Sequence, residues 1–362
     1  MFTYLMPTQI IFGRNCITEK QSFLQACGTK AMIITGRHSA KASGALEDLT
    51  NALTAQHINY MVFDKIESNP SVDTVRAAAA IGRKEQIDFV VGIGGGSPMD
   101  AAKAIALLIA NDLDDKALFS NQYDRVLPII AIPTTAGTGS EVTQYAILTN
   151  KKVGTKISIA SPKLFPVIAF ADPRYTESLS INTTINTAID ALSHAIEGYI
   201  AKRSTPISDA LAEESLQILS THLGSLRDGI SSEAREDLLY ASTLAGMVIA
   251  QSGTTIVHGM GYSLTYHLNV DHGRANGLLL PAYLTTLEES EPIKVATILE
   301  RLELADIDDF SGLMNYLLQE KIVLTESQCS DFAKEAIHTK AVDNTPLDLT
   351  EEKLIKWYAT LQ

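Results

Sequence analysis

One aspartate and three histidines in the second half of the chain are residue types that bind transition metals. Asp190 and His194 stand four residues apart in a segment with helical periodicity, so their side chains should project from one helix face. His258 and His272 follow, each beside a glycine. One carboxylate and three imidazoles form a ligand set that suits Fe²⁺ or Zn²⁺. We therefore predict a metal site with the ligands Asp190, His194, His258 and His272.

Spacing alone leaves an alternative open. A histidine in an apolar helix is often a core or surface residue without a ligand, and nothing in the spacing brings His258 and His272 to the first pair. Four candidates within one half of the chain favour the metal site. Three further histidines stand in more polar segments and are expected at the surface: His222, His267 and His338.

A glycine-rich turn in the first half has the chemistry of a phosphate site. An apolar strand over residues 88–93 is followed by Gly94, Gly95 and Gly96, which let the backbone approach a ligand closely. Ser97 can cap the next helix, and the free N–H groups at a helix start attract anions. The turn is neither a Walker A loop nor a complete G-x-G-x-x-G motif, because Ser97 occupies the last place. The alternative is a tight turn without a ligand.

A second loop, residues 132–141, also follows an apolar strand. It is rich in Thr, Ser and Gly, which can wrap a phosphate or a ribose, although it could be a simple connection. Two such loops at successive strand ends place a ligand across the edge of a sheet, where nucleotides bind.

The elements around these loops alternate between strands and helices. Strand patterns cover residues 31–35, 60–63, 88–93 and 128–133, and helical patterns cover 44–55, 71–86 and 98–111. This alternation predicts a mostly parallel sheet covered on both faces. We also expect a strand over residues 1–13 and a hairpin turn at 151–154. From residue 181 onward the pattern is helical, so we expect an α/β domain over residues 1–180 and an all-α domain over 181–362.

Composition and charge exclude several classes of partner. The net charge of −13 disfavours nucleic acid and anionic membranes. The N-terminus lacks the pattern of a signal peptide, and the most apolar stretch, 238–250, is too short to span a membrane. The three cysteines show no disulfide spacing. These observations predict a soluble, cytoplasmic protein.

Four motifs together resemble the iron-containing (group III) alcohol dehydrogenases, including their short members described as 1,3-propanediol dehydrogenases. The motifs span residues 94–103, 133–141, 190–194 and 258–273. The resemblance implies a Rossmann-like nucleotide-binding domain, a helical metal-binding domain, an active site in the cleft between them, and a homodimer. It implies Fe²⁺, with Zn²⁺ possible, and NAD or NADP. The cofactor contacts that it implies are Asn69, Gly94, Gly95, Gly96, Ser97, Asp100, Thr134, Thr135, Thr138 and Lys156.

Two positions depart from that family's pattern. Many members carry an aspartate after the strand at 31–35, where this chain has Gly36 followed by Arg37 and Ser39. Without a carboxylate to repel a 2′-phosphate, and with Arg37 to bind one, we expect NADP to be preferred over NAD. Many members also carry a second histidine four residues after the third ligand, where this chain has Tyr262. Tyr262 could relay a proton or line the substrate pocket, or it could serve packing alone.

The resulting hypothesis is a metal-dependent dehydrogenase that transfers a hydride between NAD(P) and a small primary alcohol or diol, of the 1,3-propanediol or butanol type. Within the same fold, the alternatives are a glycerol-type dehydrogenase and a dehydroquinate-synthase-like lyase. The lyase would need many lysines and arginines around the metal, and the segments around Asp190 and His258 lack them. A metal-dependent phosphohydrolase has no use for two phosphate loops, and a non-catalytic nucleotide sensor would not need four metal ligands.

Overall fold

The computed structural model describes residues 1–152 and 154–361. The chain divides into two compact units, one comprising Met6–Leu179 and the other Met1–Leu5 together with Ser180–Gln362. The first five residues thus group with the helical part. The boundary expected at residue 180 lies beside this division, and as a boundary between independently folding domains it stays a prediction.

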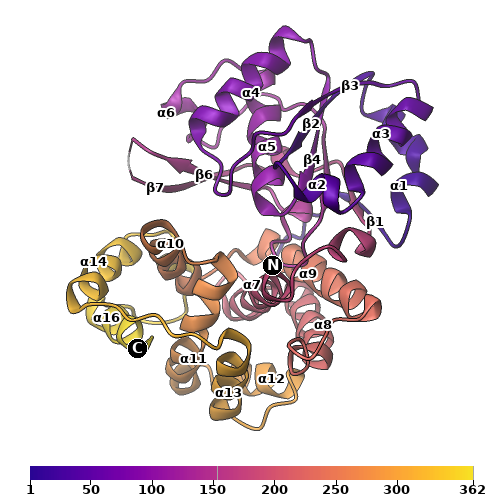
Figure 1. Cartoon of the computed structure of the whole chain (residues 1–362). Coiled ribbons are helices and arrows are strands. Elements are labelled where there is room, and N and C mark those ends of the chain that lie inside the picture. The colour runs from indigo at the N-terminus through magenta and orange to yellow at the C-terminus, as the bar shows by residue number, and fades with distance from the viewer. Residues whose placement is uncertain (153, 362) are drawn as a thin grey trace. The chain divides into compact units, whose positions relative to one another are not determined.

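The α/β unit is built on a six-stranded sheet with the strand order β1-β8-β5-β4-β2-β3. Strands β1 to β4 of this sheet are labelled in Figure 1. Every neighbouring pair in this sheet is parallel, as the alternation of strands and helices predicted. Its strands are β1 (Gln9–Phe12), β2 (Lys30–Thr35), β3 (Asn59–Phe63), β4 (Phe89–Gly94), β5 (Ile129–Pro133) and β8 (Ile168–Ala171).

Helices cover both faces of this sheet, because alternate side chains of each buried strand point to opposite sides. In β2, Met32 and Ile34 belong to the apolar core with α4 and α5, whereas Ala31 and Ile33 belong to the core with α1 and α3. The helices of this unit are α1 (Cys16–Glu19), α2 (Ser39–Ala42), α3 (Ala45–Ala55), α4 (Val72–Lys84), α5 (Gly96–Ala110) and α6 (Asp115–Leu118). Short 3₁₀ turns are η1 (Gln21–Ala26), η2 (Ser140–Val142), η3 (Pro162–Leu164) and η4 (Pro173–Thr176).

The direction of strand progression reverses between β2 and β4. From β2 the chain moves outward to β3, then returns to the other side of β2 and continues through β4, β5 and β8. The carboxyl ends of β2 and β4 are therefore neighbours at a switch point, where open α/β sheets bind ligands. Gly36 follows β2, and Gly95 follows β4. The topology thus places the glycine-rich turn where a nucleotide site is expected.

Two local predictions concern the N-terminal strand and the turn at residues 151–154. The N-terminal strand covers only Gln9–Phe12 instead of residues 1–13. Pro7 has no N–H to donate, and the backbone of Leu5 bonds instead to the side-chain amide of Gln251. The turn expected at 151–154 includes Val153, which lies outside the described residues. The strands on either side of it, β6 (Tyr145–Asn150) and β7 (Thr155–Ala160), form an antiparallel pair.

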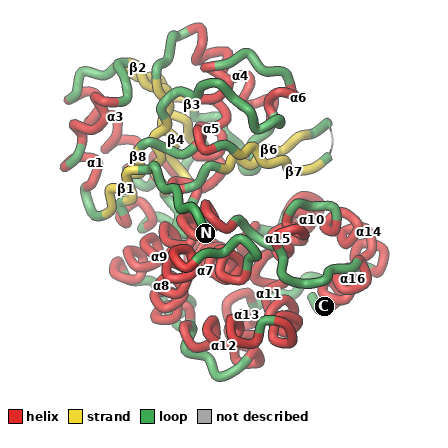
Figure 2. Tube along the Cα trace, turned by 180° about the vertical axis from the view of Figure 1, so that it is seen from behind, coloured by secondary structure: helices red, strands yellow, loops and turns green. Residues whose placement is uncertain are grey.

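The second unit is helical, and the described residues after Ala171 contain no strand (Figure 2). Its first helix is α7 (Ile181–Ile200), whose start is capped by the Ser180 hydroxyl and which packs against α8, α9 and α11. No helix in the described ranges is long and apolar enough to cross a membrane. The remaining helices are α8 (Pro206–Leu223), α9 (Ser232–Ser252), α10 (Ile256–Leu268), α11 (His272–Ser290), α12 (Pro292–Arg301), α13 (Ile307–Leu318), α14 (Glu326–Ile337), α15 (Ala341–Asn344) and α16 (Glu351–Ala359).

Candidate metal centre and cofactor loops

Three helices of the helical unit bring the predicted metal ligands together. Asp190 and His194 lie on successive turns of α7 and are both buried. His258 is buried in the first turn of α10, and His272 is the first residue of α11. The chain thus places one pair by helical spacing and the other two by the convergence of two helix starts.

The ligand atoms surround one carboxylate oxygen. The Nε2 atoms of His194, His258 and His272 each lie 3.9 Å from Oδ1 of Asp190. Ligand atoms of Asp190, His194 and His258 all lie within 4.8 Å of one another. Metal–ligand bonds of about 2.0–2.2 Å put neighbouring atoms of a tetrahedral site roughly 3.3–3.6 Å apart. The three distances to Oδ1 of Asp190 are therefore a few tenths of an ångström longer than in a tetrahedral site, and the residue types suit a small transition-metal ion.

A buried carboxylate fixes the orientation of His258. Nδ1 of His258 contacts Oε2 of Glu197, whose side chain is fully buried. Oε1 of Glu197 accepts hydrogen bonds from the Thr255 amide (2.9 Å) and hydroxyl (2.6 Å). Burial lowers the pKa of His258, but Glu197 and then Asp190 raise it by more, so the pKa lies above its usual value. In the neutral ring, a proton on Nδ1 beside Glu197 would leave Nε2 with the lone pair that a metal needs.

A glycine allows α11 to approach α7. A Cβ atom at Gly273 would lie 1.8 Å from the carbonyl oxygen of Asn186 and 3.0 Å from Cβ of Asp190. The Asn186 amide also donates to Asp271, just before the start of α11. Only glycine fits at position 273, and its neighbour His272 is thereby held against the α7 ligands.

The structure also shows the surroundings of Tyr262 and of the three histidines that were expected at the surface. The Tyr262 ring stacks on His272 with 5.7 Å between centroids and 12° between planes. That the Tyr262 hydroxyl relays a proton stays a prediction. His267 and His338 are exposed, as expected, whereas His222 is half-buried and lies 2.7 Å from Asp237.

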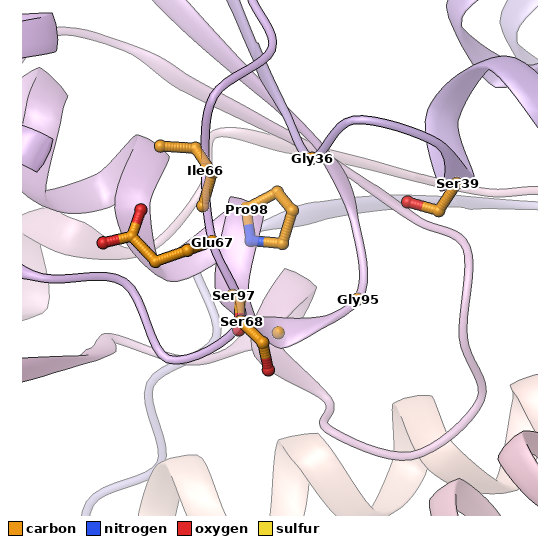
Figure 3. Close-up of a pocket in the computed structure, with 9 residues that line it drawn as sticks. Gly36, Ser39, Ile66, Glu67, Ser68, Gly95, Ser97 and Pro98 are labelled. Atoms are coloured by element: carbon orange, nitrogen blue, oxygen red, sulfur yellow. The ribbon is translucent and has the colours of Figure 1, made fainter.

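In the α/β unit a pocket of about 250 Å³ opens at the switch point (Figure 3). Helix α5 begins at Gly96, so its first N–H groups are available at this pocket. Five residues predicted as cofactor contacts line it, with four that the sequence did not single out as contacts. The first five are Gly36, Ser39, Gly95, Gly96 and Ser97, and the others are Ile66, Glu67, Ser68 and Pro98.

The second loop lies directly against the glycine turn. A Cβ atom at Gly95 would approach the Thr135 side chain to 3.2 Å, and one at Gly96 would approach Thr138 to 3.0 Å. The hydroxyl oxygens of Thr134 and Thr135 are buried and have no hydrogen-bond partner within residues 1–152 and 154–361. Such hydroxyls cost stability unless a ligand bonds to them. The two loops therefore fit a phosphate-bearing cofactor.

The remaining predicted cofactor contacts are placed differently. Both oxygens of Asp100 accept hydrogen bonds from the protein, one from the Ser140 hydroxyl and one from the Ile147 amide. The backbone N–H of Asn69 donates to the Ser97 hydroxyl, which ties Asn69 to the glycine turn. Lys156 is half-buried on β7, and Arg37 is exposed. A phosphate contact for Asp100 stays a prediction, and its visible role is to anchor the loops.

Glu197 and Asn276 belong to the centre but were not predicted. Glu197 follows His194 by three residues on the same helix, so helical spacing could have identified it. Asn276 follows His272 by four residues on α11 and contacts two predicted ligands. A parallel sheet with glycine loops at its switch point, and a helical unit with a buried aspartate–histidine cluster, are features expected of a metal-dependent dehydrogenase.

Comparisons with known proteins support the same class of enzyme. Residues 7–173 match the model of the iron-containing alcohol dehydrogenases, and residues 184–361 match the C-terminal model of that family. The chain is 33% identical to 1,3-propanediol dehydrogenase of Klebsiella pneumoniae over 91% of this chain and 86% of that protein. It is 30% identical to the NADPH-dependent butanol dehydrogenase of Clostridium saccharobutylicum over 98% and 92%. An iron-containing alcohol dehydrogenase of Thermotoga maritima superposes with a TM-score of 0.94 at 40% identity, covering 100% and 99% of the chains. The chain belongs to the iron-containing alcohol dehydrogenase family.

Proposed function

We propose that this protein is a metal- and NAD(P)-dependent dehydrogenase that interconverts a small primary alcohol or diol and its aldehyde. The observation that carries the proposal is the convergence of three imidazole nitrogens on Oδ1 of Asp190, in a chain of this family. The names of the relatives favour a substrate such as 1,3-propanediol or butanol. The sequence-based alternatives, a lyase and a phosphohydrolase, find no support among these relatives.

The metal ion, Fe²⁺ or Zn²⁺ in its place, would be held by Asp190, His194, His258 and His272. The bound ion would supply a Lewis acid for the oxygen of the alcohol or aldehyde. Glu197 keeps the proton of His258 on Nδ1 and so keeps Nε2 ready as a ligand. Tyr262, stacked on His272, is our candidate for moving the proton of the alcohol, with packing as the alternative. Replacement of Tyr262 by Phe should change the rate and its pH profile if the hydroxyl moves a proton, and an unchanged profile would refute that role.

The loops of the α/β unit would hold the cofactor, which supplies the hydride acceptor or donor. The hydroxyls of Thr134 and Thr135, which have no partner in the described part of the chain, suit its phosphates, as does the start of α5. Lys156 would reach the ribose beside the nicotinamide. A cytoplasmic location, a homodimer and an active site in a cleft between the domains stay predictions.

We further propose that NADP is preferred over NAD. Gly36 and Ser39 line the pocket, and no side chain at position 36 obstructs a 2′-phosphate. Lys41 lies 3.3 Å from Asp64, so Arg37 is the better candidate for binding the phosphate. One charge-assisted contact contributes about 1.5–3 kcal/mol, roughly ten- to a hundredfold in affinity. Gly36→Asp should shift kcat/KM toward NAD, and equal use of both cofactors that does not change on this substitution would refute the preference.

Activity is tested with protein purified without oxygen, a panel of small alcohols and aldehydes, and both cofactors. The expected result is a change in absorbance of the reduced nicotinamide that depends on Fe²⁺ or Zn²⁺. A protein that binds metal and cofactor but oxidises and reduces none of the panel would overturn the proposal. Release of phosphate from phosphate esters would instead indicate a hydrolase.

A further inference from the structure

Asn276 occupies an unusual position in the metal centre. It lies one helical turn after His272 on α11, and its side chain is completely buried. Its amide nitrogen lies 3.3 Å from Oδ1 of Asp190 and 3.2 Å from Nε2 of His258. A third contact, 3.4 Å long, joins it to the hydroxyl of Ser193. The amide therefore touches the ligating atoms themselves.

The chemistry of these neighbours fixes which way the amide faces. A carboxylate oxygen carries no hydrogen and can only accept, so the NH₂ group of Asn276 faces Oδ1 of Asp190. The side-chain oxygen of Asn276 therefore faces away from this carboxylate. That oxygen is buried and has no hydrogen-bond partner in the described part of the chain.

The surroundings accommodate this unpartnered oxygen. A Cβ atom at Gly261 on α10 would lie 2.3 Å from Oδ1 of Asn276, so a larger residue there would displace the amide. A buried carbonyl without a partner costs stability, and an apolar side chain of similar size would avoid that cost. The cost of this unpartnered oxygen is explained if the Asp190 carboxylate needs the NH₂ group of Asn276 as a donor.

We propose that Asn276 is a positioning residue of the metal centre. By donating to Oδ1, it holds the Asp190 carboxylate in the orientation that the three Nε2 atoms surround. The proposal rests on the proposed function, because it presumes that Asp190 and the three histidines bind the ion. Groups that hold ligands in this way typically change metal affinity by about 10- to 100-fold when they are removed.

The test uses full-length protein stripped of metal and titrated with Zn²⁺ against a chromophoric chelator, and with Co²⁺ for its visible spectrum. Asn276→Leu, which keeps the branched shape and removes the donor, should raise the Zn²⁺ dissociation constant about 10- to 100-fold. It should also shift the Co²⁺ bands, because the carboxylate reorients. Asn276→Ser offers a smaller side chain in case the leucine variant does not fold, and should give the same changes. Ser215→Ala removes a buried hydrogen bond to Ala241 in the same unit and serves as a control that should alter neither readout.

Unchanged affinity and spectrum in folded Asn276 variants would overturn the inference and leave the metal site standing. Full Zn²⁺ affinity in an Asp190→Ala variant would instead show that the metal site itself is wrong. A lower melting temperature of the metal-free Asn276 variants, with wild-type affinity and spectrum, would assign Asn276 to packing alone and also refute the proposal.

Discussion

The candidate metal centre and the cofactor loops are built in opposite ways. In the metal centre, side chains converge and are held by other side chains, as Glu197 holds His258. In the loops, glycines remove side chains, and the hydroxyls of Thr134 and Thr135 stay without a partner in the described protein. A metal ion needs particular atoms at fixed positions, whereas a phosphate needs backbone N–H groups and space. The centre should therefore be sensitive to the loss of supporting contacts, and the loops to added volume or lost anchors.

The largest stability effect should come from the buried anchor of the loops. The ammonium of Lys103 donates to the Ser140 hydroxyl (2.7 Å) and the Tyr145 carbonyl (2.8 Å), and lies 3.7 Å from Asp100. Lys103→Met leaves a buried carboxylate without its cation and should cost about 3–5 kcal/mol of unfolding free energy. Denaturant unfolding measures this, and a loss below about 1 kcal/mol would show that the loops do not depend on the anchor.

The same lysine gives the unfolding free energy a characteristic pH dependence. Burial lowers the pKa of Lys103 to about 8, although Asp100 and Glu141 raise it in part. The unfolded chain, whose lysines titrate near 10.5, binds more protons between pH 8 and 10.5, so this residue makes stability rise with pH there. The slope is at most about 1.4 kcal/mol per pH unit. The difference in stability between wild type and Lys103→Met should widen across this window, and a constant difference would contradict the shift.

A matched pair of glycines tests the close approach in the metal centre. Gly273→Ala places a methyl group against the Asn186 carbonyl and should cost about 1–3 kcal/mol and weaken metal binding, because His272 moves from Asp190. Gly312 lies in α13 with open space around it, so Gly312→Ala should stabilise the protein by up to about 1 kcal/mol. Equal effects of the two substitutions on metal affinity would show that the close approach at Gly273 does not hold His272 near Asp190.

Support of His258 by Glu197 is tested by a change that keeps its shape. Glu197→Gln removes the charge beside Nδ1 and should weaken metal binding by about 10- to 100-fold. Glu213→Gln, at the ion pair with Arg301, removes the same charge away from the centre and should leave metal affinity unchanged. Isothermal titration of metal-free protein distinguishes them, and similar affinities of the two variants would rule out a special role for Glu197.

The smallest effect is expected at the loop hydroxyls. Thr134→Val removes a hydroxyl without a partner in the described chain, so unfolding free energy should stay equal or rise slightly. Cofactor binding should weaken by about two- to tenfold, equivalent to roughly 0.5–1.5 kcal/mol. Thr286→Val, whose hydroxyl bonds to Ala282 on α11, is the control and should leave cofactor affinity unchanged. Unaltered cofactor affinity in Thr134→Val would remove that hydroxyl from the site.

The sequence predicted the parallel sheet because its strands and helices alternate with clear periodicity. It predicted Asp190 and His194 as a pair because both lie on one helix, but the meeting of His258 and His272 depends on how three helices pack. Asp100 illustrates the limit for single residues, since its place in the motif does not show that both its oxygens bond within the protein. The N-terminal strand was overestimated because the bond between Leu5 and Gln251 joins residues distant in sequence.

The most direct test of the account is the metal content of wild type and His272→Ala, both purified without oxygen and assayed with the same alcohol and cofactor. Among the predicted ligands, His272 is the most informative to replace because it is half-buried and lies on a separate helix, with Nε2 3.9 Å from Oδ1 of Asp190. We expect one Fe²⁺ or Zn²⁺ per wild-type chain, loss of most of the metal in the variant, and a rate lower by orders of magnitude. Full metal content and full rate in His272→Ala would contradict the four-ligand centre.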